Sequence, residues 1–173
     1  MTEMMDVYDN NRIKTDKTHV RGEKRSHAEN ILVVMILIFN DAGEMLIQKR
    51  PPHVGWAPNM WTMTAGGGVL ADEVSTQAAS RELYEELGIK IDFAGVKPKF
   101  SMTDRDAFLD YFVVRMDVDL TSLNVPNNEV AEVKWASKEE MLETIGRGEC
   151  MPYRKTFLEF CFDCADMGEC TLQ

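Results

Sequence analysis

The sequence predicts an α/β fold, with helices on both sides of a mixed β-sheet. Ile31–Phe39 is an unbroken run of apolar and mostly β-branched residues, which is typical of a strand buried on both faces. Farther along, Ser75 can cap the start of a helix that Gly88 should end, with apolar side chains along one face. Strands that alternate with a few helices indicate an α/β sandwich.

The other elements are expected in order along the chain. Asp41–Gly43 should turn the chain so that Met45–Lys49 pairs with the first strand. The further predicted elements are strands at Trp61–Ala65 (ending in Gly66–Gly68), Phe108–Val118 and Glu132–Ala136, and helices from the cap Ser137 through Glu143 and at Tyr153–Cys164. Residues 1–27 are polar and are predicted to form an irregular N-terminal segment with a turn at Asp9–Asn11. Residues 28–173 should form a single domain with a C-terminal helix.

Composition and charge exclude several classes of protein. A formal net charge of -10 repels a phosphate backbone, so nucleic-acid binding is not expected. A small phosphorylated substrate could still bind an acidic site if a cation bridged the two. The longest apolar run, Ile31–Phe39, is too short to span a bilayer, and no membrane association is expected. Met1–His19 lacks the apolar stretch of a secretory signal, and the four cysteines crowd the C-terminal end, so a reducing cytoplasm is expected.

Three glutamates in the predicted helix carry the chemistry. Glu82, Glu85 and Glu86 are spaced i, i+3 and i+4, which gathers their carboxylates on one side of a helix. Like charges at these spacings destabilise a helix by roughly 0.2–0.5 kcal/mol per pair. A hard divalent cation would offset that cost, and Mg²⁺ binds few carboxylates together with substrate phosphates and water. On this spacing alone, a solvated acidic face would be the better interpretation.

The residues around the glutamates favour the metal. The segment GGVLADEVSTQAASRELYEELGI matches the Nudix signature at every defined position, which are Gly67, Glu73, Arg81, Glu82, Leu83, Glu85, Glu86, Gly88 and Ile89. The chain therefore resembles the Nudix hydrolase family over roughly residues 28–160. The resemblance implies a Nudix-type α/β/α sandwich around a mixed sheet. It also implies a Mg²⁺-dependent hydrolase, with Mn²⁺ as a substitute, that cleaves the phosphoanhydride bond of a nucleoside diphosphate-linked or related small molecule.

The resemblance also assigns roles to residues. It implies that Glu82 and Glu86 are catalytic metal ligands, that Glu85 is a further ligand, and that the backbone near Gly67 completes the metal site. Glu73 and Arg81 match the pair that orients the catalytic helix and loop. Dimers are frequent in the family, which leaves a homodimer open.

Candidate residues also lie outside this segment. Glu129, in PNNEVAEVKW, is the choice for a metal-binding or base glutamate of the kind many family members carry, with Glu132 next; a surface carboxylate is the alternative for both. Asp110, an acid in an apolar strand, could also point into the cleft. The candidates for substrate binding are Lys49 and Arg50, which could bind phosphate, and Trp56, which could stack on a ring, whereas Trp61 is expected in the core.

Three alternatives remain open. The pattern QKR, Pro58-x-x-Trp61 and NNEVAEVKW looks like the branch related to isopentenyl-diphosphate isomerase, but Gly66 stands where that enzyme carries its catalytic cysteine. A non-catalytic nucleotide-sensing module would share the fold, although such proteins usually lose signature glutamates and none is lost here. Cys161-x-x-Cys164, with Cys150 and Cys170, could bind zinc, but Tyr153–Cys164 looks helical, which favours buried thiols.

Overall fold

The computed structural model describes residues 3–26 and 29–167, and its residues group into two compact units. The first unit comprises residues 1–36, 66–85 and 89–112, and the second comprises residues 37–65, 86–88 and 113–173. The predicted domain boundary at residues 27 and 28 lies outside the described residues, as does Cys170.

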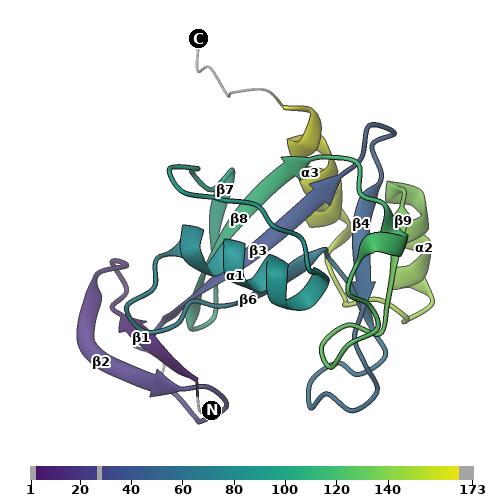
Figure 1. Ribbon diagram of the computed structural model, residues 1–173. Helices are drawn as coiled ribbons and strands as arrows, with labels where there is room; N and C mark the ends of the chain where they lie inside the picture. Colours follow the sequence, from purple (N-terminus) through teal and green to yellow (C-terminus); the bar gives the residue numbers. More distant parts are fainter. Residues whose placement is uncertain (1–2, 27–28, 168–173) are drawn as a thin grey trace. The chain divides into compact units, whose positions relative to one another are not determined.

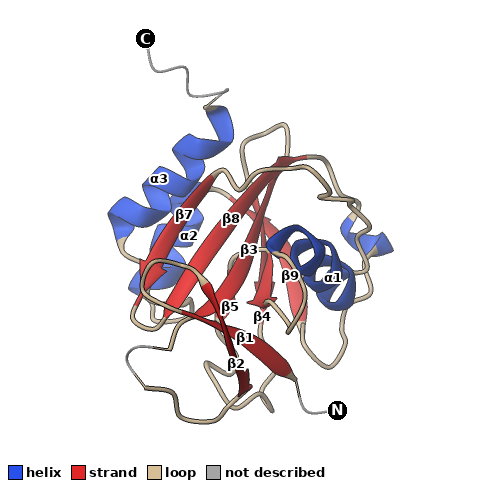
Figure 2. Ribbon diagram, turned by 90° about the vertical axis from the view of Figure 1, so that its left-hand side faces the viewer, coloured by secondary structure: helices blue, strands red, loops and turns tan. Residues whose placement is uncertain are grey.

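The α/β class predicted from the sequence is confirmed (Figure 2). The main sheet has seven strands in the order β5-β4-β3-β8-β7, with β6 paired to β3 and β9 paired to β4. Its strands are β3 (Ile31–Phe39), β4 (Met45–Lys49), β5 (Trp61–Thr62), β6 (Ala65–Gly68), β7 (Phe100–Asp104), β8 (Ala107–Arg115) and β9 (Glu132–Ala136). The helices are α1 (Ser75–Leu87), α2 (Lys138–Gly146), α3 (Lys155–Asp166) and a short 3₁₀ turn at Leu120–Ser122.

The first unit contains an N-terminal hairpin where the sequence predicted an irregular segment (Figure 1). Strands β1 (Met4–Tyr8) and β2 (Lys14–Val20) pair antiparallel, and the predicted turn at Asp9–Asn11 connects them. The Asp9 carboxylate accepts hydrogen bonds from the N–H groups of Asn11 and Ile13, both at 2.9 Å. The prediction missed β2 because its sequence, KTDKTHV, is charged and mostly exposed, so no apolar pattern marks it.

The second unit is built on β4. Strand β9 pairs with β4 along five residues, and Thr64 joins two strands by accepting from Ile38 N–H (2.9 Å) and donating to Leu46 C=O (2.6 Å). Helix α2 begins at a capping box in which Ser137 and Glu140 each bond the other's backbone N–H, as the sequence predicted for Ser137. Helix α3 buries Phe162 edge-on against Phe39, with ring centroids 5.2 Å apart.

Several boundaries differ from the sequence prediction. The single strand predicted at Trp61–Ala65 is divided into β5 (Trp61–Thr62) and β6 (Ala65–Gly68), so Gly66–Gly68 belong to a second strand, which pairs with β3. Strand β7 was not predicted, since four of its five residues are exposed and it lacks alternation. Helix α1 begins at Ser75 itself, and the Val74 N–H is capped by the Gln77 side chain at 3.0 Å. Gly88 ends the helix at φ +75°, as predicted.

Candidate active site

Helix α1 positions two of the predicted glutamates. Leu83 and Leu87 are fully buried and fix which face of the helix points inward. Glu82 and Glu86 lie one helical turn apart and are also buried, with exposed fractions of 5% and 6%. Burying a carboxylate costs free energy unless it is paired or hydrogen-bonded. Each of these two glutamates therefore needs partners around its carboxylate.

In the first unit, Arg81 gathers the other acidic groups of the signature. Its guanidinium donates to both carboxylate oxygens of Glu73, at 3.0 and 2.8 Å, and to the Gly68 carbonyl at 2.9 Å. It also donates to Glu82 at 2.7 Å and to Glu85 at 3.1 Å. Such forked, charge-assisted bonds are geometrically specific. This arrangement agrees with the orienting role implied for Glu73 and Arg81.

Burial and pairing shift the pKa values of two groups in this network. Burial raises the pKa of Glu82, while the hydrogen bond and the positive charge of Arg81 act in the opposite direction. Burial by itself would lower the pKa of Arg81, but its hydrogen bonds with Glu73 and Glu82 outweigh that effect and raise the pKa above its usual range. The arginine is therefore a permanent cation beside Glu82.

Gly67 is required by the position of Glu82. A Cβ atom built on Gly67 would lie 2.2–2.5 Å from the carboxylate atoms of Glu82, closer than any real contact. The backbone of β6 therefore approaches the carboxylate as only glycine allows. This close approach supports the expectation that the backbone at Gly67 belongs to the site.

In the second unit, Gln48 and Asn127 surround Glu86. The Gln48 amide, only 3% exposed, donates to the Glu86 carboxylate at 2.8 Å. Asn127 donates to the Glu86 backbone carbonyl at 2.8 Å and accepts from the N–H groups of Glu129 and Val130, both at 2.8 Å. The sequence prediction missed Gln48 and Asn127; the only signal was the turn-forming pair Asn127-Asn128.

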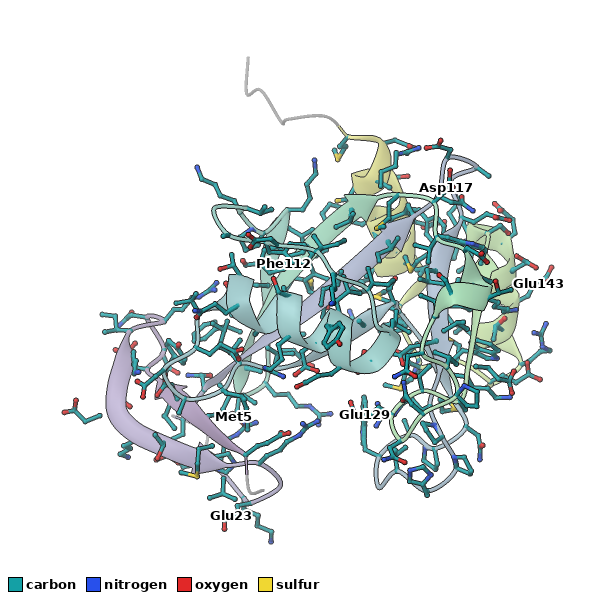
Figure 3. The ribbon with its side chains drawn as sticks, in the orientation of Figure 1. Met5, Glu23, Phe112, Asp117, Glu129 and Glu143 are labelled. Carbon is teal, nitrogen blue, oxygen red and sulfur yellow. The ribbon has the colours of Figure 1, made fainter. Side chains whose placement is uncertain are left out.

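Glu86 is the common member of two carboxylate pairs. One of its oxygens lies within 4.8 Å of an oxygen of Glu82 on the same helix, and within 4.8 Å of an oxygen of Glu129 in the second unit. Glu129 is exposed and lies in the loop before β9 (Figure 3). Oxygen donors at this spacing, two of them buried, fit a hard divalent cation, which would also offset the cost of burying like charges.

The remaining candidates are placed differently. Glu85 is half-exposed and bonds Arg81. Lys49 pairs with Glu132 at 3.1 Å, and the two residues are register partners on β4 and β9. Because side chains alternate along a strand, both lie on the face of the sheet opposite to Gln48. Neither is therefore directed toward Glu86.

Arg50 and Trp56 form a contact of their own in the second unit. Arg50 donates to the Trp56 carbonyl at 3.0 Å, and its guanidinium lies 5.3 Å from the centre of the indole ring. Trp56 is 65% exposed and open to a ligand. Trp61, expected in the core, is half-buried with the ammonium groups of Lys49 and Lys134 near its ring, at 5.6 and 5.1 Å.

Two other candidates have structural partners. Asp110 is 1% exposed in the first unit and accepts hydrogen bonds from Arg12 and Ser101, which account for a charged residue in an apolar strand. Cys150, Cys161 and Cys164 are buried, and burial raises the pKa of Cys161 to about 12. Cys161 and Cys164 lie among the buried residues of helix α3, as expected for thiols that belong to the core.

Comparison with known proteins identifies the family. The model of the NUDIX domain matches residues 29–153. An uncharacterized Nudix hydrolase of Listeria monocytogenes is 44% identical over 152 residues, which cover 87% of this chain and 89% of that protein. The chain therefore belongs to the Nudix family. It is a Nudix pyrophosphohydrolase, an enzyme of a family that generally uses divalent metals.

Two more distant similarities concern the fold and the activities named for other proteins that resemble this chain. The crystal structure of DR0079 from Deinococcus radiodurans superposes with a TM-score of 0.76 at 22% identity, covering 92% of this chain and 99% of that one. At that identity the likeness concerns the fold. A protein of Methanosarcina mazei named prenyl-diphosphate phosphatase is 29% identical over 108 residues, 61% of this chain and 63% of its own length. Within residues 3–26 and 29–167, no helix is long and apolar enough to cross a membrane.

Proposed function

We propose that the protein hydrolyses the phosphoanhydride bond of a nucleoside diphosphate-linked small molecule with Mg²⁺ held by Glu82 and Glu86 of helix α1, and with Glu129 as the base. The observation that carries this proposal is Glu86, a buried carboxylate with carboxylate oxygens of both Glu82 and Glu129 within 4.8 Å. Glu85 can reach the same cation as a further ligand if it leaves Arg81. The backbone at Gly67 approaches Glu82 closely enough to take part.

Each residue has a distinct task in this reaction. When bound, Mg²⁺ supplies Lewis-acid polarisation of the diphosphate and lowers the pKa of attacking water. Glu82 and Glu86 bind the cation, and Arg81 and Gln48 orient them through hydrogen bonds of 2.7 and 2.8 Å. Glu129, exposed and held by Asn127 at its backbone, accepts the proton from water. The backbone hydrogen bonds keep Glu129 in place while its side chain remains free to take up that proton.

Arg50 and Trp56 are proposed to bind the substrate. The Arg50 guanidinium can fork onto a phosphate, and the exposed Trp56 indole can stack on a base. His53 and Asn128 hydrogen-bond at 3.1 Å, which ties the loop that carries Trp56 to the loop that carries Glu129. Lys49 is not part of this proposal, because it lies on the face of β4 opposite to Gln48.

A prenyl diphosphate is the second candidate substrate, favoured by the similarity to the Methanosarcina mazei prenyl-diphosphate phosphatase. A prenyl chain would pack against Trp56 through apolar contact, whereas a nucleobase would stack on it. An isomerase reaction is not favoured, because Gly66 occupies the position of the required cysteine. A cytoplasmic location accords with the buried free thiols of Cys150 and Cys161.

Hydrolysis assays that detect the nucleoside monophosphate and the other products would test the proposal. The purified protein should be incubated with nucleoside diphosphate sugars, dinucleotides, nucleoside diphosphates and triphosphates, and geranyl and farnesyl diphosphate, each with Mg²⁺, Mn²⁺ or excess chelator. We expect metal-dependent cleavage of one nucleotide class, identified by product chromatography. Faster turnover of the prenyl diphosphates would shift the assignment to the second candidate. Binding of nucleotides without cleavage of any compound would favour the nucleotide-sensing module.

A further inference from the structure

The N-terminal hairpin contacts the segment that leads into α1, residues 68–74 (the lead-in loop; Figure 1). The Met4 carbonyl accepts from the Ala71 N–H at 2.8 Å. Met5 lies directly over Gly68, where an added Cβ would be 2.7 Å from its sulfur atom. All of these residues belong to the first unit. The hairpin is therefore packed against the lead-in loop through both backbone and side chains.

Asp6 makes the most specific of these contacts. Its carboxylate is 4% exposed and accepts from the Asp72 N–H at 2.9 Å. The Lys14 ammonium lies 2.7 Å from Asp6 and 2.9 Å from the carboxylate of Asp72, so one cation joins the hairpin to the loop. Hydrogen bonds to Asp6 and Asp72 raise the pKa of Lys14 above its usual range.

Asp72 has a backbone conformation that needs such support. Its φ is +64°, in the left-handed region that residues other than glycine rarely adopt. Such a conformation persists only where the surroundings hold it in place. The Asp72 side chain is 92% exposed and contributes little packing, so its N–H bond to Asp6 and its ion pair with Lys14 are the contacts by which the hairpin holds this residue.

The conformation of the lead-in loop determines where Arg81 lies. Glu73 follows Asp72 directly, and its carboxylate accepts from both the Leu70 N–H at 3.0 Å and Arg81. Arg81 in turn donates to the Gly68 carbonyl and to Glu82. Through these bonds, a change at Asp72 would reach Glu82.

We propose that Asp6 is a positioning residue for metal binding: it holds the lead-in loop so that Glu73 and Arg81 orient Glu82. The proposal rests on the metal site given under Proposed function. It assigns to the hairpin, which lies outside the residues matched by the family model, a part in the enzyme's metal affinity.

Direct metal binding is the test. Mn²⁺ affinity of the full chain, measured by electron paramagnetic resonance without substrate, should weaken about tenfold in Asp6→Ala, which is the usual scale for loss of a group that orients a metal ligand. Lys17→Gln is the matched control, since Lys17 lies in the same hairpin and its ion pair with Glu29 is exposed. The control should bind Mn²⁺ as the wild type does. If the wild type itself binds no Mn²⁺, the proposed function fails rather than the role of Asp6.

Two further variants separate positioning from mere stability. In Asp6→Ala/Asp72→Gly, glycine adopts φ +64° without strain, so much of the lost Mn²⁺ affinity should return. If Asp6→Ala does not melt cooperatively, Lys14→Gln takes its place, and we expect about threefold weaker binding. A lower melting temperature with unchanged Mn²⁺ affinity in the single variant would overturn the proposal, as would a double variant that binds no better than Asp6→Ala.

Discussion

The two buried glutamates of α1 have the same side chain and nearly the same burial, but different partners. Glu82 accepts from the cation Arg81, which also holds Glu73 and the Gly68 carbonyl. Glu86 accepts from the neutral amide of Gln48, and its backbone carbonyl from the neutral amide of Asn127. An arginine binds a carboxylate through a charge-assisted fork, whereas an amide donates a single neutral hydrogen bond. Glu82 is therefore oriented by a fork that also holds Glu73, and the Gln48 amide contributes one directional bond to Glu86.

The largest effect is expected for Glu86→Gln. This change keeps the shape of the side chain but removes the charge that would bind Mg²⁺, so kcat should fall by about 10²–10⁴-fold. Steady-state hydrolysis of the best substrate, followed by product chromatography, measures it, after a cooperative melt shows that the protein folds. Glu143→Gln, which removes the same charge from an exposed position on α2 (Figure 3), should keep kcat within about twofold. A variant at Glu86 with near-native turnover would falsify the proposal that Glu86 is a metal ligand.

Gly67→Ala tests how closely Glu82 is held. The added methyl would lie 2.2–2.5 Å from the Glu82 carboxylate and must displace it. A displacement of about 1 Å can cost on the order of 10²-fold in rate, so we expect a loss of that size in kcat/KM. Gly146→Ala is the control, since nothing lies within 4 Å of a Cβ there. Equal rates in the two variants would mean that Glu82 can move without consequence.

Gln48→Met tests the neutral partner. Methionine matches glutamine in length but cannot donate to Glu86, so the carboxylate keeps its charge and loses this orienting hydrogen bond. Loss of such a supporting group typically costs 10–100-fold, and about tenfold is expected here in the Mg²⁺ concentration that gives half-maximal rate. A titration of rate against Mg²⁺ measures it. An unchanged titration would mean that the other contacts of Glu86 are enough to orient its carboxylate.

The smallest effect is expected for Glu85→Gln. Glu85 is half-exposed and pairs with Arg81 at 3.1 Å, and exposed pairs contribute only about 0–1 kcal/mol. Turnover should therefore fall by about threefold at saturating Mg²⁺, with a similar small change in Mg²⁺ dependence. A loss comparable with that of Glu86→Gln would instead make Glu85 a principal ligand.

The sequence was informative where function depends on local spacing. Glu82 and Glu86 share a helical face because they are four residues apart, and Gly88 and Ser137 end and cap helices through their own backbone preferences. Gln48 could not be found in this way, because it meets Glu86 across 38 residues of sequence. Only the folded sheet brings such a pair together.

The missed strands have a similar explanation. β2 and β7 are mostly exposed, so neither shows the alternation that indicates a half-buried strand. Their conformation comes from backbone pairing with β1 and β8, which a pattern of apolar residues does not record. Side-chain direction was missed as well: Lys49 and Gln48 are adjacent in sequence but lie on opposite faces of β4.

The contacts at the two ends of the chain bear on how the enzyme can be shortened. A protein trimmed to the matched residues 29–153 would lose Asp6 and with it the acceptor for the Asp72 N–H. It would also lose α3, uncovering Phe39 where Phe162 now packs. Sequence similarity therefore outlines a region smaller than the one that must fold. A shortened version of this enzyme should therefore begin at residue 3 and extend at least through Asp166.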